Sequence, residues 1–422
     1  MTRLALLGLL AFAGVADAKP NVLFVLADDQ RFDTVAALGN KEIATPTLDA
    51  LVGRGFTFTN AYCQGGNSPA VCVPSRTQLL TGRSTFRTPN PQAKTYDAPT
   101  LGKTFRDAGY ATLCVSKPGN SFRAAHDHFE KVVHIPHSGA QTNAKCTDAV
   151  LDYLKTADEK KPFFLYYAPS MPHDPRTAEA AFHEQYDPAK LTLGKNFTAK
   201  VPVDFGVLNI RDEKLAKYPR DEAEMRKHLA EYYACISSLD HHLSRILEKL
   251  RSLKKLDNTV IVFTSDQGLA VGGRHGLMGK QNLYEHFKSP LIVAGPGIPK
   301  GRSGALVYLY DLYPTCCEAT GVETPKECDG SSLMPVISGR KKAVREALFC
   351  VYTGTQRMVR DDRFKLLWYP MIEKMELFDL KADSDELANL AADAAHSDTL
   401  ARMKKLMAAE QVRFGDKLPA MQ

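Results

Sequence analysis

Cys72 is the residue of this chain whose neighbours are best suited to chemistry. It lies in the run VCVPSRTQLLTGR, residues 71–83, and Pro74 and Arg76 follow it within four positions. Proline fixes the backbone φ beside the cysteine, and the planar guanidinium of arginine binds oxyanions. The segment therefore predicts a nucleophile beside an anion-binding group. The alternative is that Cys72 is a half-cystine or a buried structural thiol.

Two pairs of polar residues end two runs that have the apolar composition of buried parallel strands. Asp28 and Asp29 follow the run NVLFVLA, and Asp266 and Gln267 follow the run TVIVFTS. Binding sites in open α/β sheets lie at the carboxyl ends of the strands. Carboxylate and amide oxygens are the ligands that hard cations take. The pattern predicts a cation site at this edge, although an Asp pair after a strand also occurs as a helix cap or a loop.

A histidine and two lysines follow other predicted strands. His173 lies between two prolines after the apolar run FFLYY, so its backbone is fixed, as a positioned general acid or base requires. Lys117 follows the run ATLCV, and Lys280 ends the glycine-containing turn GGRHGLMGK. We therefore expect these cations to face the same edge of the sheet.

The signature around Cys72 and the opening NVLFVLADDQ resemble those of the type I sulfatases, members of the alkaline phosphatase superfamily. The resemblance implies that a formylglycine-generating maturation enzyme converts Cys72 to Cα-formylglycine (3-oxoalanine), whose hydrated aldehyde is the nucleophile. It implies catalytic roles for Cys72, Arg76, Lys117, His173 and Lys280. It also implies calcium (Ca2+) ligation by Asp28, Asp29, Cys72, Asp266 and Gln267, and substrate contacts by Arg83 and His275.

Two positions depart from the family pattern. Family members commonly have a histidine two or three residues after the lysine that corresponds to Lys117, and this chain has Asn120 there. An imidazole could come instead from one of four nearby histidines, His126, His128, His134 or His137. Gln267 stands where asparagine or histidine is commonest, but its amide oxygen can still serve as a cation ligand.

The order of predicted elements indicates an α/β protein. Apolar strands alternate with amphipathic helices, which favours a large, mostly parallel mixed sheet flanked by helices. We predict this catalytic domain over residues 19–337. Short strands after residue 338 predict a smaller C-terminal α+β subdomain, residues 338–422, with a short antiparallel sheet. Residues 186–219 lack periodicity and form a long insertion, of the kind that often lines substrate pockets.

The N-terminus predicts export. Residues 1–18 have a basic residue, an apolar run and a small-residue cleavage site, which are typical of a secretory signal peptide. We expect a periplasmic or secreted protein without a stable membrane anchor after cleavage; the alternative is an N-terminal anchor helix. The nine cysteines could then form up to four disulfides and leave Cys72 unpaired, although several lie in apolar runs where buried free thiols are as reasonable.

Charge and composition limit the partners. The chain has 54 basic and 48 acidic residues, a net charge of +6, without a clustered basic stripe, so nucleic-acid binding is not expected. We predict a calcium-dependent sulfatase that hydrolyses sulfate esters, most simply those of a sulfated saccharide. The alternatives are a phosphonate or phosphate-ester hydrolase of the same superfamily, and a catalytically silent protein that binds sulfated glycans.

Overall fold

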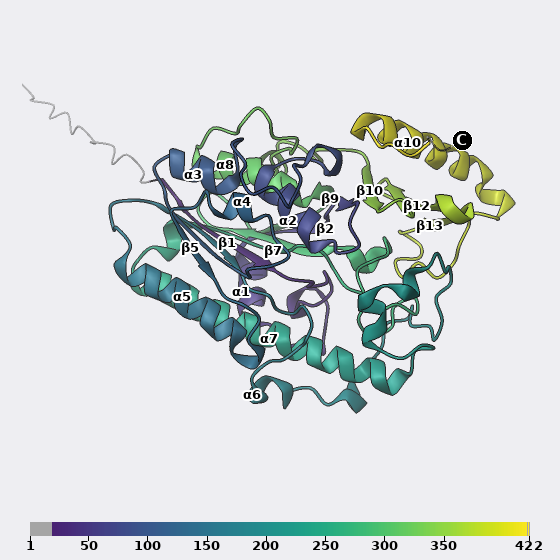
Figure 1. The fold of residues 1–422 in the computed structure, drawn as a ribbon, viewed down its shortest axis with the longest axis horizontal. Coiled ribbons are helices and arrows are strands. Elements are labelled where there is room, and N and C mark those ends of the chain that lie inside the picture. Colours follow the sequence, from purple (N-terminus) through teal and green to yellow (C-terminus); the bar gives the residue numbers. More distant parts are fainter. Residues whose placement is uncertain (1–18, 420, 422) are drawn as a thin grey trace, which may run out of the picture.

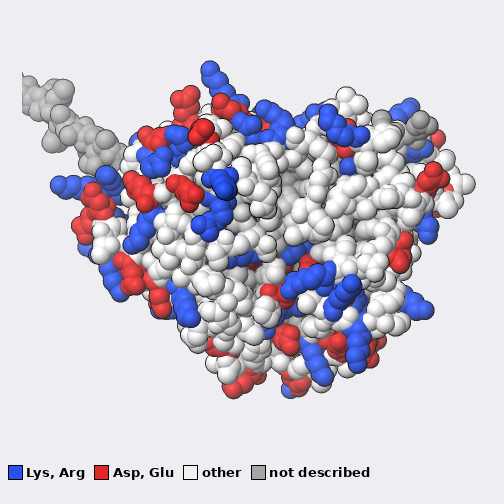
Figure 2. Space-filling model, in the orientation of Figure 1, with Lys and Arg blue, Asp and Glu red and all other residues white. Residues whose placement is uncertain are grey.

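The computed structural model describes residues 19–419 and residue 421. The predicted signal peptide, residues 1–18, lies outside the described residues. Within them, no helix is both long enough and apolar enough to cross a membrane. Acidic and basic side chains are interspersed over the face shown in Figure 2.

An eight-stranded sheet forms the centre of the molecule (Figure 1). Its strands lie in the order β5 (Lys131–His134), β4 (Ala111–Ser116), β6 (Phe163–Ala168), β1 (Asn21–Ala27), β7 (Thr259–Ser265), β8 (Ser289–Ala294), β2 (Phe56–Tyr62) and β9 (Gly301–Tyr308). Neighbouring strands are parallel except where β8 pairs antiparallel with β7 and β2. The prediction of a mostly parallel mixed sheet is therefore confirmed.

Helices cover both faces of this sheet. One face carries α1 (Pro46–Arg54), α5 (Thr142–Thr156) and α7 (Glu222–Ser252), and the other carries α2 (Cys72–Thr81), α3 (Leu101–Asp107), α4 (Arg123–His126) and α8 (Leu312–Thr320). Alternate residues of β1 serve the two cores: Leu23 and Val25 pack towards α7, whereas Phe24 and Leu26 pack towards α2. Because both faces are covered, the strand is apolar from Val22 to Ala27, as its sequence indicated.

A second, smaller sheet lies in the C-terminal region. Its five strands lie in the order β13 (Lys374–Asp379), β12 (Phe364–Tyr369), β11 (Gln356–Arg360), β10 (Leu348–Tyr352) and β3 (Gly65–Gly66). The first four pair antiparallel, as predicted, and α10 (Ser397–Phe414) packs on them through Met403 and Met407. The fifth strand, β3, comes from the segment just before Cys72, so the two parts of the chain share a sheet.

Among the further short helices are α6 (Ala180–His183), α9 (Met334–Ile337) and the 3-10 turn Arg211–Leu215. α9 ends at the residue where we predicted the catalytic domain to end; the boundary itself stays a prediction. All nine cysteines lie in the described residues, and none forms a disulfide.

The helix of the central motif, α2, starts at Cys72, and Ser75 N donates to Val71 O at 3.0 Å. Pro74 fits the first turn because proline has the φ of a helix, and an amide in the first turn has no intrahelical partner to lose. Cys72 is thus the first residue of the helix itself.

Candidate active site

Strand ends bring most of the predicted residues together. Asp28 and Asp29 follow β1, Asp266 and Gln267 follow its neighbour β7, and Lys117 follows β4. His173 lies in the loop after β6, and Cys72 begins α2 on one face of the sheet. Asp29 and Gln267, 238 positions apart in the chain, therefore meet at the carboxyl edge of the sheet.

Cys72 lies at the closed end of this cluster. Its Sγ lies 3.1 Å from Lys280 Nζ, 3.1 Å from Gln267 Nε2 and 3.6 Å from Asp29 Oδ1. The side chain is buried, and burial raises the pKa of its thiol well above the usual value, although the charge of Lys280 opposes this. An unmodified Cys72 is therefore held as a neutral thiol, which is a poor nucleophile.

Asp29 is held in an uncommon backbone conformation that turns it towards Cys72. Its φ is 72°, in the left-handed region that a non-glycine residue rarely adopts. Its amide donates to Asp266 Oδ1 at 2.9 Å, and its carbonyl accepts from Tyr232 Oη at 2.6 Å. Its carboxylate accepts from Lys280 Nζ at 2.9 and 2.8 Å. Strained backbone of this kind gathers at functional sites.

Arg76 places a fully buried guanidinium one helical turn after Cys72. Its Nε donates to Asp266 Oδ2 at 3.0 Å, and its Nη2 lies 3.3 Å from Asp28 Oδ2. Nη1 and Nη2 have no hydrogen-bond acceptor among the described residues. Buried donors without acceptors are costly, so this guanidinium is equipped to bind a further anion.

Lys117 and His173 complete the ring of polar groups. Lys117 Nζ makes an ion pair with Asp28 Oδ2. His173 Nδ1 lies 2.7 Å from the carbonyl oxygen of Asp174, and its Nε2 lies 3.9 Å from Asp29 Oδ2. A proton on Nδ1 would be held by that carbonyl, so Nε2 is the ring nitrogen left to face the cluster.

The acidic residues fit a cation. Asp28, Asp29, Cys72 and His173 each offer one ligand atom, and these atoms all lie within 4.8 Å of one another. Asp28 Oδ1 and Gln267 Oε1 are buried oxygens without a hydrogen-bond donor among the described residues. Buried oxygens that lack donors are what a hard cation would satisfy.

Two neighbouring carboxyls respond in opposite ways to this crowding. Burial raises the pKa of Asp28, but the charges of Lys117 and Arg76 outweigh it and hold that pKa well below the usual value. Burial, with the negative charge of Asp28, raises the pKa of Asp266 to about 6. Asp28 is therefore an anion. The repulsion between the two carboxylates raises the pKa of Asp266 instead.

His137 is the histidine that the fold brings towards the cluster. Its Nδ1 lies 3.2 Å from Ser170 Oγ, and its Nε2 is buried without a partner in the described chain. Burial, together with the charge of His173, lowers the pKa of His137, whereas Asp28 acts in the opposite direction. Asn120, where the family has histidine, is exposed.

The other three candidate histidines, His126, His128 and His134, make contacts away from the cluster. His126 contacts Ser121 at 2.8 Å and His134 at 3.1 Å, and it is buried beside β5. His128 Nδ1 lies 2.8 Å from Thr100 Oγ1 at the start of α3. Of the four candidates, His137 is thus the one whose charge interacts with both His173 and Asp28.

Two predicted substrate contacts lie apart from Cys72. His275 stacks on Tyr284, with ring centroids 4.0 Å apart, and lies 3.2 Å from the amide of Asn196. Arg83 follows the C-terminal end of α2, about 15 Å along the helix from Cys72. Among the described residues, no hydrogen bond or ion pair joins either side chain to the cluster, and their predicted substrate contacts stay predictions.

Three residues next to the cluster carried no recognisable signal in the sequence. Asp174 follows His173, and Arg211 and Asp212 lie in the insertion. Asp212 Oδ2 lies 3.8 Å from Lys280 Nζ, and Arg211 makes a two-pronged ion pair with Asp174. The insertion has no periodic pattern, so the sequence only indicated that it lines a pocket.

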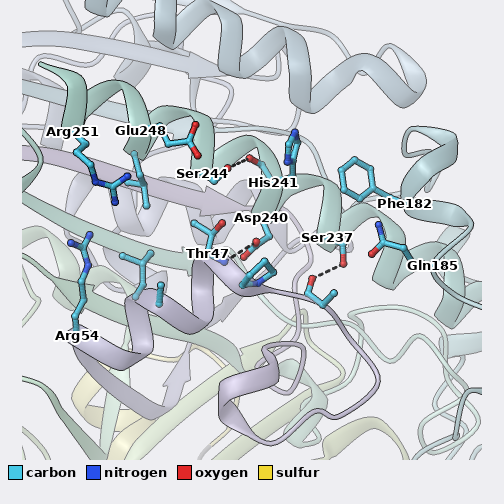
Figure 3. Close-up of a pocket in the computed structure, with 15 residues that line it drawn as sticks. Thr47, Arg54, Phe182, Gln185, Ser237, Asp240, His241, Ser244, Glu248 and Arg251 are labelled. Atoms are coloured by element: carbon cyan, nitrogen blue, oxygen red, sulfur yellow. Dashed lines mark hydrogen bonds between the residues drawn. The ribbon is translucent and has the colours of Figure 1, made fainter.

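A separate pocket of about 540 Å3 lies between α1 and α7 (Figure 3). Asp240 on its wall accepts from the amides of Thr47 and Leu48 at 2.9 and 2.8 Å and so caps α1. None of the predicted site residues lines this pocket. Its polar groups serve the packing of two helices, and the chemistry lies at the strand ends.

Comparison with known proteins identifies the class to which this fold and site belong. The sulfatase family model matches residues 20–322, and the model for the C-terminal region of N-sulphoglucosamine sulphohydrolase matches residues 273–413. The chain belongs to the sulfatase family. The predicted enzyme class, a sulfuric ester hydrolase, is thereby confirmed.

Three known proteins illustrate the likeness. An N-acetylglucosamine-6-O-sulfatase of Bacteroides thetaiotaomicron is 26% identical, over 95% of this chain and 88% of that protein. A solved structure described as a complex with its substrate D-glucosamine-2-N,6-O-disulfate has a TM-score of 0.75 and 23% identity, over 96% of this chain and all of that chain. A phosphonate monoester hydrolase from Silicibacter pomeroyi has a TM-score of 0.78 and 23% identity, over 94% and 96%.

Proposed function

We propose that this protein is a calcium-dependent sulfatase that removes sulfate from a sulfated carbohydrate through a formylglycine made from Cys72. The observation that carries the proposal is the position of Cys72 Sγ, 3.1 Å from Lys280 Nζ and 3.6 Å from Asp29 Oδ1, at the closed end of a cluster that also holds Arg76 and Lys117. A sulfate group carries charge on several oxygens, and preorganised cations stabilise that charge as it grows.

The thiol of Cys72 does not suit the reaction without modification. Burial keeps it neutral, and a neutral thiol attacks poorly. Formylglycine at this position would supply the hydroxyl of a hydrated aldehyde as the nucleophile. The side chain of residue 72 already points between Lys280 and Asp29, which would orient such a hydroxyl.

Calcium would be held by Asp28, Asp29, Asp266 and Gln267, with residue 72 beside it, and would supply further neutralisation of the sulfate oxygens. Arg76 and Lys117 bind sulfate oxygens from the side of α2 and β4. Lys280 reaches the same point from the glycine-containing turn. Each of these three cations is now paired with a carboxylate. When calcium binds the carboxylates, the cations would be released to bind the sulfate oxygens.

His173 is the acid for the leaving alcohol. Its Nδ1 is held at the carbonyl of Asp174, so a proton on Nε2 faces the cluster. The side chain is 14% exposed, more than those of Asp29 and Lys280. It therefore stands between the buried sulfate pocket and solvent, where the leaving group must depart.

The carbohydrate substrate is supported by the named relatives, which include sulfatases of N-acetylglucosamine and of ulvan. Export before action fits such a substrate, and we propose a periplasmic or secreted enzyme, matured by a formylglycine-generating enzyme. Hydrolysis of phosphonate or phosphate esters is the second candidate. One relative, 26% identical, is described as a multifunctional alkaline phosphatase superfamily protein, and Asn120 and Gln267 depart from the sulfatase pattern.

The test is sulfate release from a panel of defined sulfated mono- and oligosaccharides. The enzyme is first confirmed by mass spectrometry to carry formylglycine at position 72. We expect release from at least one saccharide, and Cys72→Ala should abolish it. Binding of a sulfated glycan without release, by protein confirmed to be modified, would instead support a silent binding protein.

A further inference from the structure

Arg211 and Asp212, from the insertion after His173, connect two parts of the proposed machinery. Both lie in the 3-10 turn Arg211–Leu215. On one side the turn contacts Asp174, the neighbour of His173, and on the other side it contacts Lys280. The insertion therefore closes over the site between the acid and the lysine that faces residue 72.

The contacts form an unbroken chain. Arg211 Nη1 donates to Asp174 Oδ1 at 2.9 Å, and Nη2 makes a second bond to Asp174 Oδ2. Arg211 Nη1 also donates to Asp212 Oδ1 at 3.0 Å. Asp212 Oδ2 accepts from Gln281 at 2.6 Å and lies 3.8 Å from Lys280 Nζ. Asp174 Oδ1 in turn lies 3.5 Å from His173 Nδ1.

The turn is rigidly placed. Glu213, its third residue, accepts from the amides of Met278 and Gly279 at 2.9 and 2.8 Å, and it pairs with the buried Arg220 at 2.5 Å. Gly279 admits this approach, since a Cβ there would lie 2.9 Å from Asp212 Cβ. The groups are thus held in place before any substrate arrives.

The exposed fractions of the side chains show which end of this chain of contacts faces solvent. The side chain of Arg211 is 60% exposed, whereas those of Asp174 and Asp212 are 8% and 9% exposed. Lys280 below them is 3% exposed. Arg211 is therefore the residue of this chain of contacts that meets solvent, at the mouth of the site.

The charges of this mouth decide what it can bind. Asp174 and Asp212 carry two negative charges and Arg211 carries one positive charge, so the three groups together carry a net negative charge. Lys280 Nζ, 3.8 Å from Asp212 Oδ2, balances that charge, so these groups together offer no excess charge to a second anionic group. Carboxylate oxygens accept several hydrogen bonds each, and the guanidinium has five donors, so unused capacity remains for hydroxyl groups.

We propose that Asp174, Arg211 and Asp212 form the subsite for the leaving saccharide and that they bind uncharged hydroxyl groups next to the sulfated carbon. The inference rests on the proposed hydrolysis of sulfate esters. A site built to bind hydroxyls discriminates strongly against a leaving group that lacks them. The subsite thus favours a sugar over an aryl alcohol.

The test compares two substrates in Arg211→Ala. One is the sulfated monosaccharide that the wild type hydrolyses best, and the other is 4-nitrophenyl sulfate, whose leaving group has no further hydroxyls. Loss of hydrogen bonds to a charged group is worth about 10- to 100-fold. We expect kcat/KM for the sugar to fall by about that factor, mainly through KM, while kcat/KM for the aryl sulfate changes less than about twofold.

Lys214→Ala is the matched control, because Lys214 is an exposed cation in the same turn. It should leave both substrates unaffected. An equal loss on both substrates in Arg211→Ala would mean that Arg211 only positions His173, and it would overturn the subsite, as would no loss on either. A wild type that hydrolyses neither substrate would contradict the proposed function, whereas a wild type active on aryl sulfate alone would overturn the subsite and the carbohydrate substrate but leave sulfate-ester hydrolysis standing.

Discussion

Lys280 Nζ lies 3.1 Å from Cys72 Sγ, although 208 residues separate the two in the chain. The lysine is buried, and burial alone would lower its pKa. The charge of Asp29 reverses this and raises the pKa well above the usual value. Lys280 is therefore a permanent cation next to the predicted nucleophile.

Replacing Lys280 by methionine should lower kcat by about 10²- to 10³-fold, because a preorganised charge is lost where negative charge develops. The measurement is steady-state hydrolysis of a series of aryl sulfates. Lys280→Arg should recover part of the rate. Thermal unfolding controls for folding, since the change leaves Asp29 with one fewer partner. Unchanged kcat in a folded Lys280→Met protein would remove Lys280 from the mechanism.

His137 should matter to the rate and Asn120 should not. His137 Nε2 is buried and unpartnered in the described chain, and its charge interacts with His173. We expect His137→Ala to lower kcat by about tenfold or more, within the range of acid–base contributions. Asn120→Ala, an exposed position, is the control. Equal activity of the two variants would show that no imidazole replaces the one missing after Lys117.

Calcium should stabilise the folded protein. Binding to the native state alone at 100 times the dissociation constant adds about 2.7 kcal/mol. We expect calcium to raise Tm in a titration and a chelator to reverse the effect. Gln267→Leu should weaken the response, because leucine has a similar size but offers no oxygen ligand. A Tm that is independent of calcium in the wild type would contradict the proposed cation site.

His275 should affect acid stability rather than substrate binding. Burial, with the charges of Lys365 and Arg274, lowers its pKa to about 3, so folding keeps the ring neutral. Below the unfolded pKa of about 6.5 the unfolded chain takes up a proton that the folded protein does not, so stability is lost as pH falls. In His275→Gln this loss between pH 6.5 and 3 should be smaller, with KM unchanged. A raised KM would instead restore His275 as a substrate contact.

The positions of the strand-end residues could be predicted from the sequence. An apolar run that stops at Asp28 or Asp266 indicates both the strand and the edge of the sheet at which that strand ends. The sequence could not place the ring of His275, whose φ of 53° and contact with Asn196 turn it towards Tyr284, and the substrate contact of His275 stays a prediction. It also failed for Arg211, since contacts made by an aperiodic insertion depend on tertiary packing rather than on a local pattern.

The central claim is that the site acts on sulfate esters. The most direct measurement is the ratio of kcat/KM for an aryl sulfate to that for the matching aryl phosphonate monoester, with protein confirmed to carry formylglycine at position 72. We predict that the sulfate is strongly preferred and that Cys72→Ala abolishes its hydrolysis. A large preference for the phosphonate, or sulfate hydrolysis that survives in Cys72→Ala, would contradict the account.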